Sequence, residues 1–187
     1  MKRIITVLLV LCGLSHAYAD SFGCQDTTSA YAIIFTSALA ARANIDTFAL
    51  TVSETGYELD SVGISATNNG AGECLMHVGL YLVEEGSPTD SIADATITIS
   101  TTDHKWWTAE LSQSLTNGNT YTIAIAHGGS NNPKIYYFNG SGSNRSLNTG
   151  TVLNDPWTED SQDQYYYCVK AWYHIEAGES RKVGVRK

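Results

Sequence analysis

Basic residues are scarce in this sequence, which has 11 Lys and Arg against 19 Asp and Glu and a formal net charge of −8 at pH 7. Four of the basic residues lie close to the C-terminus, at Arg181, Lys182, Arg186 and Lys187. The rest of the chain is therefore strongly acidic, and such a surface repels the phosphates of nucleic acids and anionic lipids. We expect no nucleic-acid partner, and we interpret residues 179–187 as a short basic tail.

The sequence also lacks the motifs of common catalytic sites. It has no Gly-x-Ser-x-Gly elbow, no His-Glu-x-x-His pair and no phosphate-binding glycine loop. Four of its histidines are scattered through the chain, at His77, His104, His127 and His174. We therefore predict a non-enzyme with no catalytic residues. A glycoside-active enzyme stays an alternative, because its two carboxylates have no spacing by which a sequence reveals them.

Long hydrophobic runs are missing except at the N-terminus. Residues 1–19 contain a basic pair, an apolar run from Ile4 to Leu14 and a small-x-small site at Ala17 to Ala19. This is the layout of a secretory signal peptide, and the run is shorter than the roughly 20 residues of a membrane span. We predict a signal peptide over residues 1–19, no membrane span and a secreted product, extracellular or periplasmic. The mature chain would keep 9 basic and 19 acidic residues, a net charge of −10.

Helical spacing of apolar residues is nearly absent, and period-two alternation takes its place. From Cys74 to Leu82 every second residue is apolar, and a turn composition follows at residues 84–88. Similar short runs recur at residues 48–52, 62–66, 95–101, 107–111, 121–125, 135–138 and 165–175. About nine such strands predict an all-β sandwich or barrel.

Two segments depart from this pattern. Residues 31–44 have no clean alternation and are rich in alanine, which predicts a strand followed by an irregular or helical turn. Residues 128–164 are rich in Gly, Ser, Asn and Asp, and we expect long exposed loops there.

Four different segments that contain these strands follow one another along the chain. They are IDTFALTVSETGYELDSVGISA (45–66), HVGLYLVEEGSPTDSIA (77–93), KWWTAELSQSLTNGNTYTIAIA (105–126) and QYYYCVKAWY (164–173). Together they resemble a family of secreted bacterial jelly-roll modules found in extracellular and surface-anchored proteins. The resemblance implies an antiparallel jelly-roll β-sandwich of about nine strands over residues 20–178. It also implies a role in extracellular display or glycan binding, and it brings no catalytic residues.

Aromatic side chains are the clearest indication of a binding site, because sugar rings stack on Trp and Tyr. If Trp107 faces the core with its alternating neighbours, Trp106 faces outward. In the last strand, alternation places Tyr165, Tyr167 and Tyr173 inward, and Tyr166, Lys170 and Trp172 outward. We name five candidate ligand-binding residues: Trp106, Tyr136, Tyr137, Trp157 and Trp172. The alternative is that the partner sheet or a loop covers these rings, as happens to most large aromatics.

Acidic residues gather near the end of the loop-rich segment. Asp155, Glu159, Asp160 and Asp163 lie within nine residues. Carboxylate oxygens in a flexible loop suit Ca²⁺, so these four are candidate ligands of a structural calcium ion, although the spacing matches no EF-hand loop. A solvated acidic loop is the alternative.

Three cysteines follow the predicted signal peptide, Cys24, Cys74 and Cys168, and none forms a Cys-x-x-Cys pair. In an oxidising compartment an odd number predicts one disulfide and one thiol. Because the first and last strands of jelly rolls commonly lie side by side, we predict a Cys24–Cys168 disulfide. Cys74 shares the phase of the inward apolar residues of its strand, so we predict that it is the buried thiol.

These observations favour a secreted recognition module that binds a glycan or another cell-surface polymer through exposed aromatics and Asn- and Asp-rich loops. The alternative is a structural subunit that self-assembles in an extracellular layer, fibre or envelope.

Overall fold

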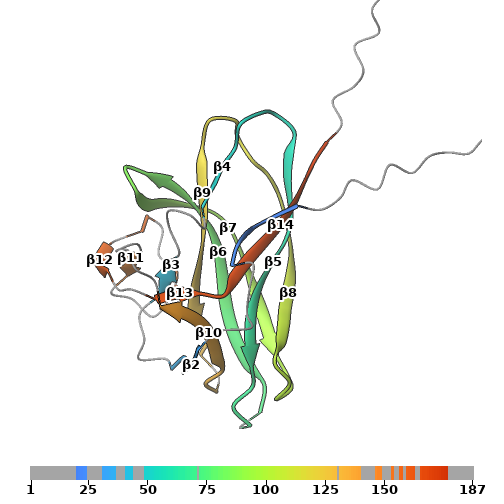
Figure 1. The fold of residues 1–187 in the computed structure, drawn as a ribbon, viewed down its shortest axis with the longest axis vertical. Coiled ribbons are helices and arrows are strands. Elements are labelled where there is room, and N and C mark those ends of the chain that lie inside the picture. The colour runs from blue at the N-terminus through green and yellow to red at the C-terminus, as the bar shows by residue number, and fades with distance from the viewer. Residues whose placement is uncertain are drawn as a thin grey trace, which may run out of the picture.

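The computed structural model describes residues 20–24, 31–36, 41–43, 49–70, 72–129, 131–139, 146–148, 153, 156–157, 159–162 and 165–176. The predicted signal peptide and basic tail lie outside these residues. The described part of the chain forms two antiparallel sheets (Figure 1). None of the described residues forms a helix long and apolar enough to cross a membrane.

Sheet 1 is organised around the long strand β5. Its seven strands are β1 (Asp20–Gly23), β2 (Tyr31–Ile34), β5 (Tyr57–Thr67), β8 (Lys105–Ser114), β10 (Lys134–Asn139), β13 (Tyr165–Tyr167) and β14 (Val169–Ile175). β14 pairs along one edge of β5 and β8 along the other. β1 then pairs with the far edge of β14, so the first and last described strands are neighbours, as predicted.

Sheet 2 is organised around β6 and β9. Its seven strands are β3 (Arg42–Ala43), β4 (Leu50–Thr51), β6 (Cys74–Glu84), β7 (Ser87–Ile99), β9 (Thr120–His127), β11 (Ser146–Asn148) and β12 (Glu159–Gln162). A tight hairpin joins β6 to β7 through Glu85 and Gly86, which both have positive φ, 51° and 81°. Positive φ at both central residues is the requirement of a type I′ turn.

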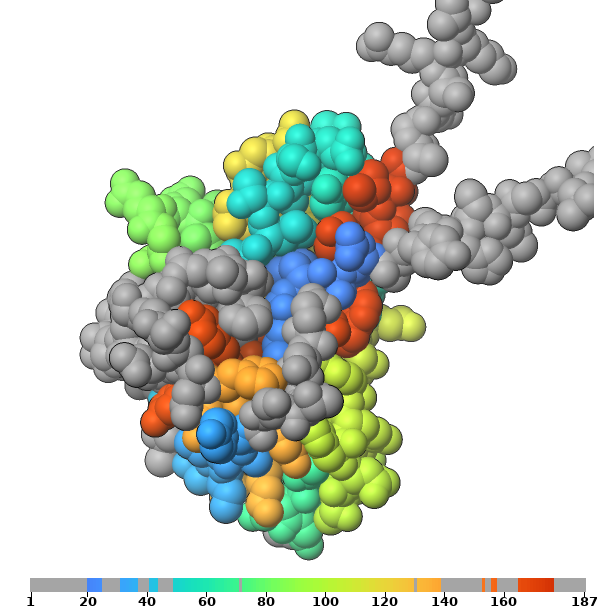
Figure 2. All heavy atoms as spheres, viewed as in Figure 1, coloured from blue at the N-terminus to red at the C-terminus, as the bar shows by residue number. Residues whose placement is uncertain are grey.

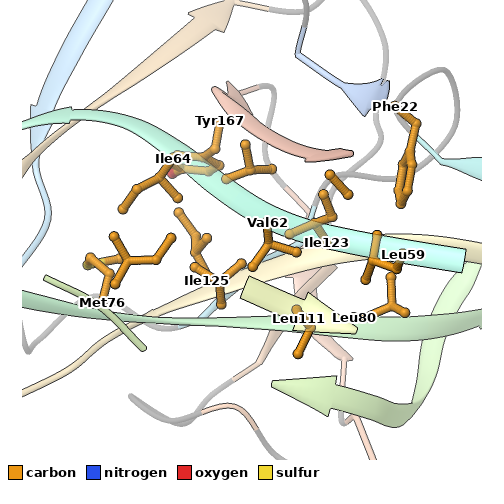
Figure 3. Close-up of a cluster of buried hydrophobic side chains, with 14 of the residues drawn as sticks. Phe22, Leu59, Val62, Ile64, Met76, Leu80, Leu111, Ile123, Ile125 and Tyr167 are labelled. Carbon is orange, nitrogen blue, oxygen red and sulfur yellow. The ribbon is translucent and has the colours of Figure 1, made fainter. Parts of the chain in front are cut away.

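Alternating apolar residues of the two sheets meet between them and form the main core. In β5 the buried residues include Leu59, Val62 and Ile64, and in β6 they include Met76 and Leu80. Figure 3 shows these side chains interdigitating from opposite sheets. The fold is therefore an antiparallel β-sandwich, and the predicted fold class is confirmed.

The number of strands is higher than predicted. The described residues form fourteen strands, and several of the additional ones have only two to four residues. Within residues 128–164, where we expected long loops, β10 matches the run predicted at residues 135–138, whereas β11 and β12 were not predicted. Short edge strands form because a neighbouring strand offers hydrogen-bond partners, so they need no strong alternation of their own.

Candidate functional site

The candidate site lies on the outer face of sheet 1, the face turned away from sheet 2. Trp106 of β8 and Trp172 of β14 are both partly exposed there, and their ring centroids lie 6.0 Å apart in an edge-to-face arrangement at 85°. In Figure 2, β1 (blue), β14 (red) and β8 (yellow-green) reach the surface on one side of the molecule. These two predicted rings, 66 residues apart in sequence, are therefore brought together by β8 and β14.

Alternation in both strands explains why these rings face outward. The neighbours of Trp172 in β14 are Ala171 and Tyr173, which are buried in the main core. The neighbour of Trp106 in β8 is Trp107, which packs against the core and donates from Nε1 to the carbonyl oxygen of Ala66 at 3.0 Å. Adjacent residues of a strand point to opposite faces, so Trp106 and Trp172 project away from the core, as predicted.

Lys170 places a positive charge at this pair. Its Nζ lies 4.9 Å from the ring centroid of Trp106 and 5.7 Å from that of Trp172. The cross-strand neighbours of Lys170 are both glycines, Gly23 in β1 and Gly63 in β5. Neither of these described neighbours therefore places a side chain directly beside Lys170, and its ammonium makes cation–π contacts with the two indoles.

A second aromatic contact lies on the same face, beyond Trp106. His104 stacks on Tyr136 of β10 with 3.6 Å between ring centroids and 9° between planes. His104 Nε2 lies 2.7 Å from the hydroxyl of Ser65, a residue that is opposite Trp106 in the sheet register. Desolvation lowers the pKa of His104, which favours the neutral imidazole. His104 was not among the predicted binding residues, although its spacing of two residues from Trp106 was a usable signal.

Polar side chains occupy the opposite end of the face. Glu58 accepts hydrogen bonds from the hydroxyls of Ser112 at 3.2 Å and Ser114 at 2.7 Å. His174 Nδ1 lies 2.8 Å from Asp60 Oδ1. The outer face therefore combines a central aromatic pair, a cation and flanking hydrogen-bonding groups.

Tyr137, another predicted ring, belongs to a separate cluster. It packs partly against the main core and contacts Tyr31 at 5.9 Å, Tyr165 at 4.8 Å and Tyr167 at 6.3 Å. Tyr31 and Tyr165 are 58% and 38% exposed. Tyr165, which we predicted to face inward, contacts Tyr137 but stays exposed, because β13 lies at the edge of sheet 1 and pairs with β10 rather than with β5.

Trp157 is not an exposed ligand-binding residue, so this prediction is wrong. Its side chain is only 7% exposed and lies edge-to-face on Tyr81, with 5.1 Å between centroids. The outer face of sheet 2 carries small side chains that leave room for it, namely Ala41, Ala43, Ala124 and Ala126. The backbone N–H of Trp157 donates to the carbonyl oxygen of Thr89, whereas its buried Nε1 has no hydrogen-bond partner in the described part of the chain.

The predicted calcium ligands fall mostly beyond the structural description. Asp155 and Asp163 lie outside the described residues, and Glu159 and Asp160 are described only as backbone in β12. Within the described residues, no group of three or more His, Cys, Asp or Glu side chains could hold a metal ion. The calcium site stays a prediction.

The predicted Cys24–Cys168 disulfide is not found among the cysteines of the described residues, all of which are buried. The N–H of Cys24 donates to the carbonyl oxygen of Val169, so Val169 rather than Cys168 lies opposite Cys24. The backbone of Cys168 is held elsewhere, because its N–H donates to Tyr136 and its carbonyl oxygen accepts from Ser65.

Comparisons with known proteins identify the fold and nothing finer. No protein-family model and no curated protein matches the chain. Among solved structures, it is similar to the clostridial cysteine protease Cwp84 after propeptide cleavage, with a TM-score of 0.53 and 13% identity over 84% of this chain and 40% of that one. A structure of the cysteine protease and lectin-like domains of Cwp84, a surface layer associated protein of Clostridium difficile, gives a TM-score of 0.46 and 11% identity over 77% of this chain and 36% of that one. This chain therefore spans less than half the length of the structures it matches, and it shares a β-sandwich fold with part of the first.

Proposed function

We propose that this chain is a non-enzymatic secreted recognition module that binds glycans on the outer face of sheet 1. The pairing of Trp106 with Trp172 is the observation that carries the proposal. Two partly exposed indoles in contact provide adjoining apolar surfaces on which the C–H faces of sugar rings can stack. A shared fold does not fix a function, so the proposal rests on this site rather than on the structural likeness.

The hydrogen-bonding capacity of the two indoles supports a binding role. Among the described residues, neither Trp106 nor Trp172 has a partner for its Nε1, whereas Trp107 is bonded to the backbone. Ser61, which lies beside Trp172, and the exposed Thr108 add hydroxyl groups on the same face. A sugar lying on the rings would therefore find both apolar contacts and directional hydrogen bonds.

The neighbouring Ser65–His104 pair does not favour catalysis. Ser65 is only 1% exposed, so its hydroxyl is not open to a substrate carbonyl. Within the described residues, no carboxylate bonds to the other nitrogen of His104, as a nucleophile–base–acid arrangement requires. The pair instead fixes the imidazole against Tyr136.

A glycan array followed by calorimetry on the mature chain tests the proposal. We expect binding to at least one oligosaccharide, and we expect Trp106→Ala and Trp172→Ala each to weaken it by about tenfold through loss of stacking. Tyr31→Ala is the matched control, because Tyr31 is an exposed ring on a different part of sheet 1. Absence of binding to every glycan at millimolar concentration, or equal effects of all three variants, contradicts the proposal.

A self-assembling structural subunit is the second candidate function. Tyr31 and Ile34 of the short strand β2 are 58% and 43% exposed, and among the described strands β2 pairs only with β10. Exposed apolar residues on an edge strand favour pairing with another chain. Light scattering at increasing concentration tests this candidate: Tyr31→Ser with Ile34→Lys should remove any oligomer, and a wild-type monomer at all concentrations contradicts it.

A further inference from the structure

We infer that Lys170 makes the outer face of sheet 1 selective for glycans that carry a carboxylate, such as uronic or sialic acids. The inference rests on the proposed glycan site and adds the chemical class of its ligand. The carboxylate would lie at Nζ of Lys170 while the sugar ring stacks on an adjacent indole.

The ammonium of Lys170 is held in a defined place. The stem projects from β14 between two strands that present glycine at this position, Gly23 and Gly63. The indoles of Trp106 and Trp172 lie within 4.9 Å and 5.7 Å of Nζ. A cation already positioned beside the stacking surface loses little side-chain freedom when it binds an anion.

Lys170 has no ion-pair partner among the described residues, although the chain has 19 acidic residues. Two carboxylates of this face have other partners, and the exposed Glu110 lies in the row of Trp172 and Ser61 rather than in that of Lys170 and Gly63. Glu58 accepts hydrogen bonds from two serine hydroxyls, and Asp60 is bonded to His174. Glu58 is opposite His174, four residues from Lys170 along β14 and therefore about 13 Å away along the strand.

Electrostatics define which acidic glycans fit. Indole contacts stabilise an ammonium only modestly, so a ligand carboxylate would form a stronger, charge-assisted hydrogen bond with it. The mature chain would have a net charge of −10, which opposes the approach of densely charged polyanions. The expected ligand is therefore a glycan with isolated carboxylates, not a highly sulfated one.

Lys105 provides a matched control for this lysine. Its Nζ lies 4.0 Å from the ring centroid of Trp107, so it makes a cation–π contact of the same kind. Trp107, however, packs against the core and its Nε1 is bonded to Ala66. Lys105→Met therefore removes a comparable charge and contact without altering the proposed site.

The test uses pairs of oligosaccharides that differ only in their acid group: one uronic-acid and one sialylated member, each beside its carboxyl-reduced neutral form. We expect the wild-type chain to prefer the acidic form of at least one pair by about five- to tenfold at low salt. Lys170→Met should abolish the preference and change neutral-form affinity by about twofold or less. Lys170→Arg and Lys105→Met should retain the preference, which should decline with added salt.

The outcomes separate the role of Lys170 from the existence of the glycan site. If the wild-type chain binds neutral forms as tightly as acidic ones, or if Lys170→Met keeps the preference, the role of Lys170 is overturned while the glycan site stands. If the wild-type chain binds neither form and no other glycan, the proposed function fails and this inference fails with it. Near-ultraviolet circular dichroism of each variant verifies folding, and the Lys170→Arg variant gives an independent readout if Lys170→Met does not fold.

Discussion

Trp172 lies directly against Gly63 of the neighbouring strand. A Cβ atom added to Gly63 would lie 2.8 Å from Cζ3 and 3.0 Å from Cη2 of the indole, and 3.0 Å from the carbonyl oxygen of Trp107. Only a residue without a side chain at this position lets the ring rest on the sheet. Gly63 therefore determines where Trp172 meets Trp106.

We predict that Gly63→Ala displaces the Trp172 ring and weakens glycan binding by about tenfold, as the loss of a stacking surface would. The backbone contact to Trp107 cannot relax as easily as a ring, so the free energy of unfolding should also fall by about 1–3 kcal/mol. Calorimetry and urea unfolding measure the two effects. Thr98→Ala is the control, because Thr98 is an exposed residue of β7 in sheet 2, away from the proposed site. Wild-type affinity in Gly63→Ala would show that the position of Trp172 does not matter.

Trp157 should contribute to stability and not to glycan binding, because its ring is buried on Tyr81. We expect Trp157→Ala to lower the free energy of unfolding by about 3–5 kcal/mol. Trp157→Phe should cost less, since it keeps most of the ring and removes a buried N–H that has no partner among the described residues. Urea unfolding measures both variants, with Trp106→Ala as the control. A Trp157→Ala variant as stable as wild type contradicts the burial of this ring.

The stability of the chain should depend on pH through His104. Desolvation lowers the pKa of His104 in the folded chain below its ordinary value of 6.5, so the unfolded chain binds this proton more readily. The contribution of His104 to stability is therefore complete above the unfolded pKa of about 6.5 and is lost as the pH falls through the lower folded pKa.

The control for this pH dependence is His104→Phe, which keeps a flat ring beside Tyr136 but cannot titrate. Between about pH 7.5 and pH 5, its melting temperature should fall less than that of the wild-type chain. An NMR titration of the imidazole gives the folded pKa directly. A midpoint at or above 6.5 contradicts the prediction.

Cys74 should be an unreactive thiol in the native chain. Its side chain is fully buried in the main core, and desolvation raises the pKa of the thiol. The thiolate is the reactive form, so alkylation of Cys74 should be slow in native buffer and fast in urea. Mass spectrometry of non-reduced peptides measures the labelling and shows in the same experiment whether any two cysteines are linked. A linked or rapidly labelled Cys74 would refute the prediction.

The local pattern of apolar and polar residues determined by itself where the long strands of this protein lie. Period-two alternation located β5, β6, β8, β9 and β14, because successive residues of a half-buried strand alternate between the apolar core and the solvent. The same rule placed Trp106 and Trp172 outward and Cys74 inward. It could not show that the outward rings touch, since that depends on β5 lying between β8 and β14.

Only the tertiary structure decided which of the aromatic residues predicted to be exposed are exposed, and which residues contact one another across strands. Trp157 lies in a polar, acidic segment that suggests a loop, yet a surface of alanines on sheet 2 accepts its ring. The role of Gly23 and Gly63 could be recognised only from the strand register, which places both of them beside Lys170. Alternation is a property of one strand, whereas contacts between faces and across strands depend on long-range pairing, which no short stretch of sequence contains.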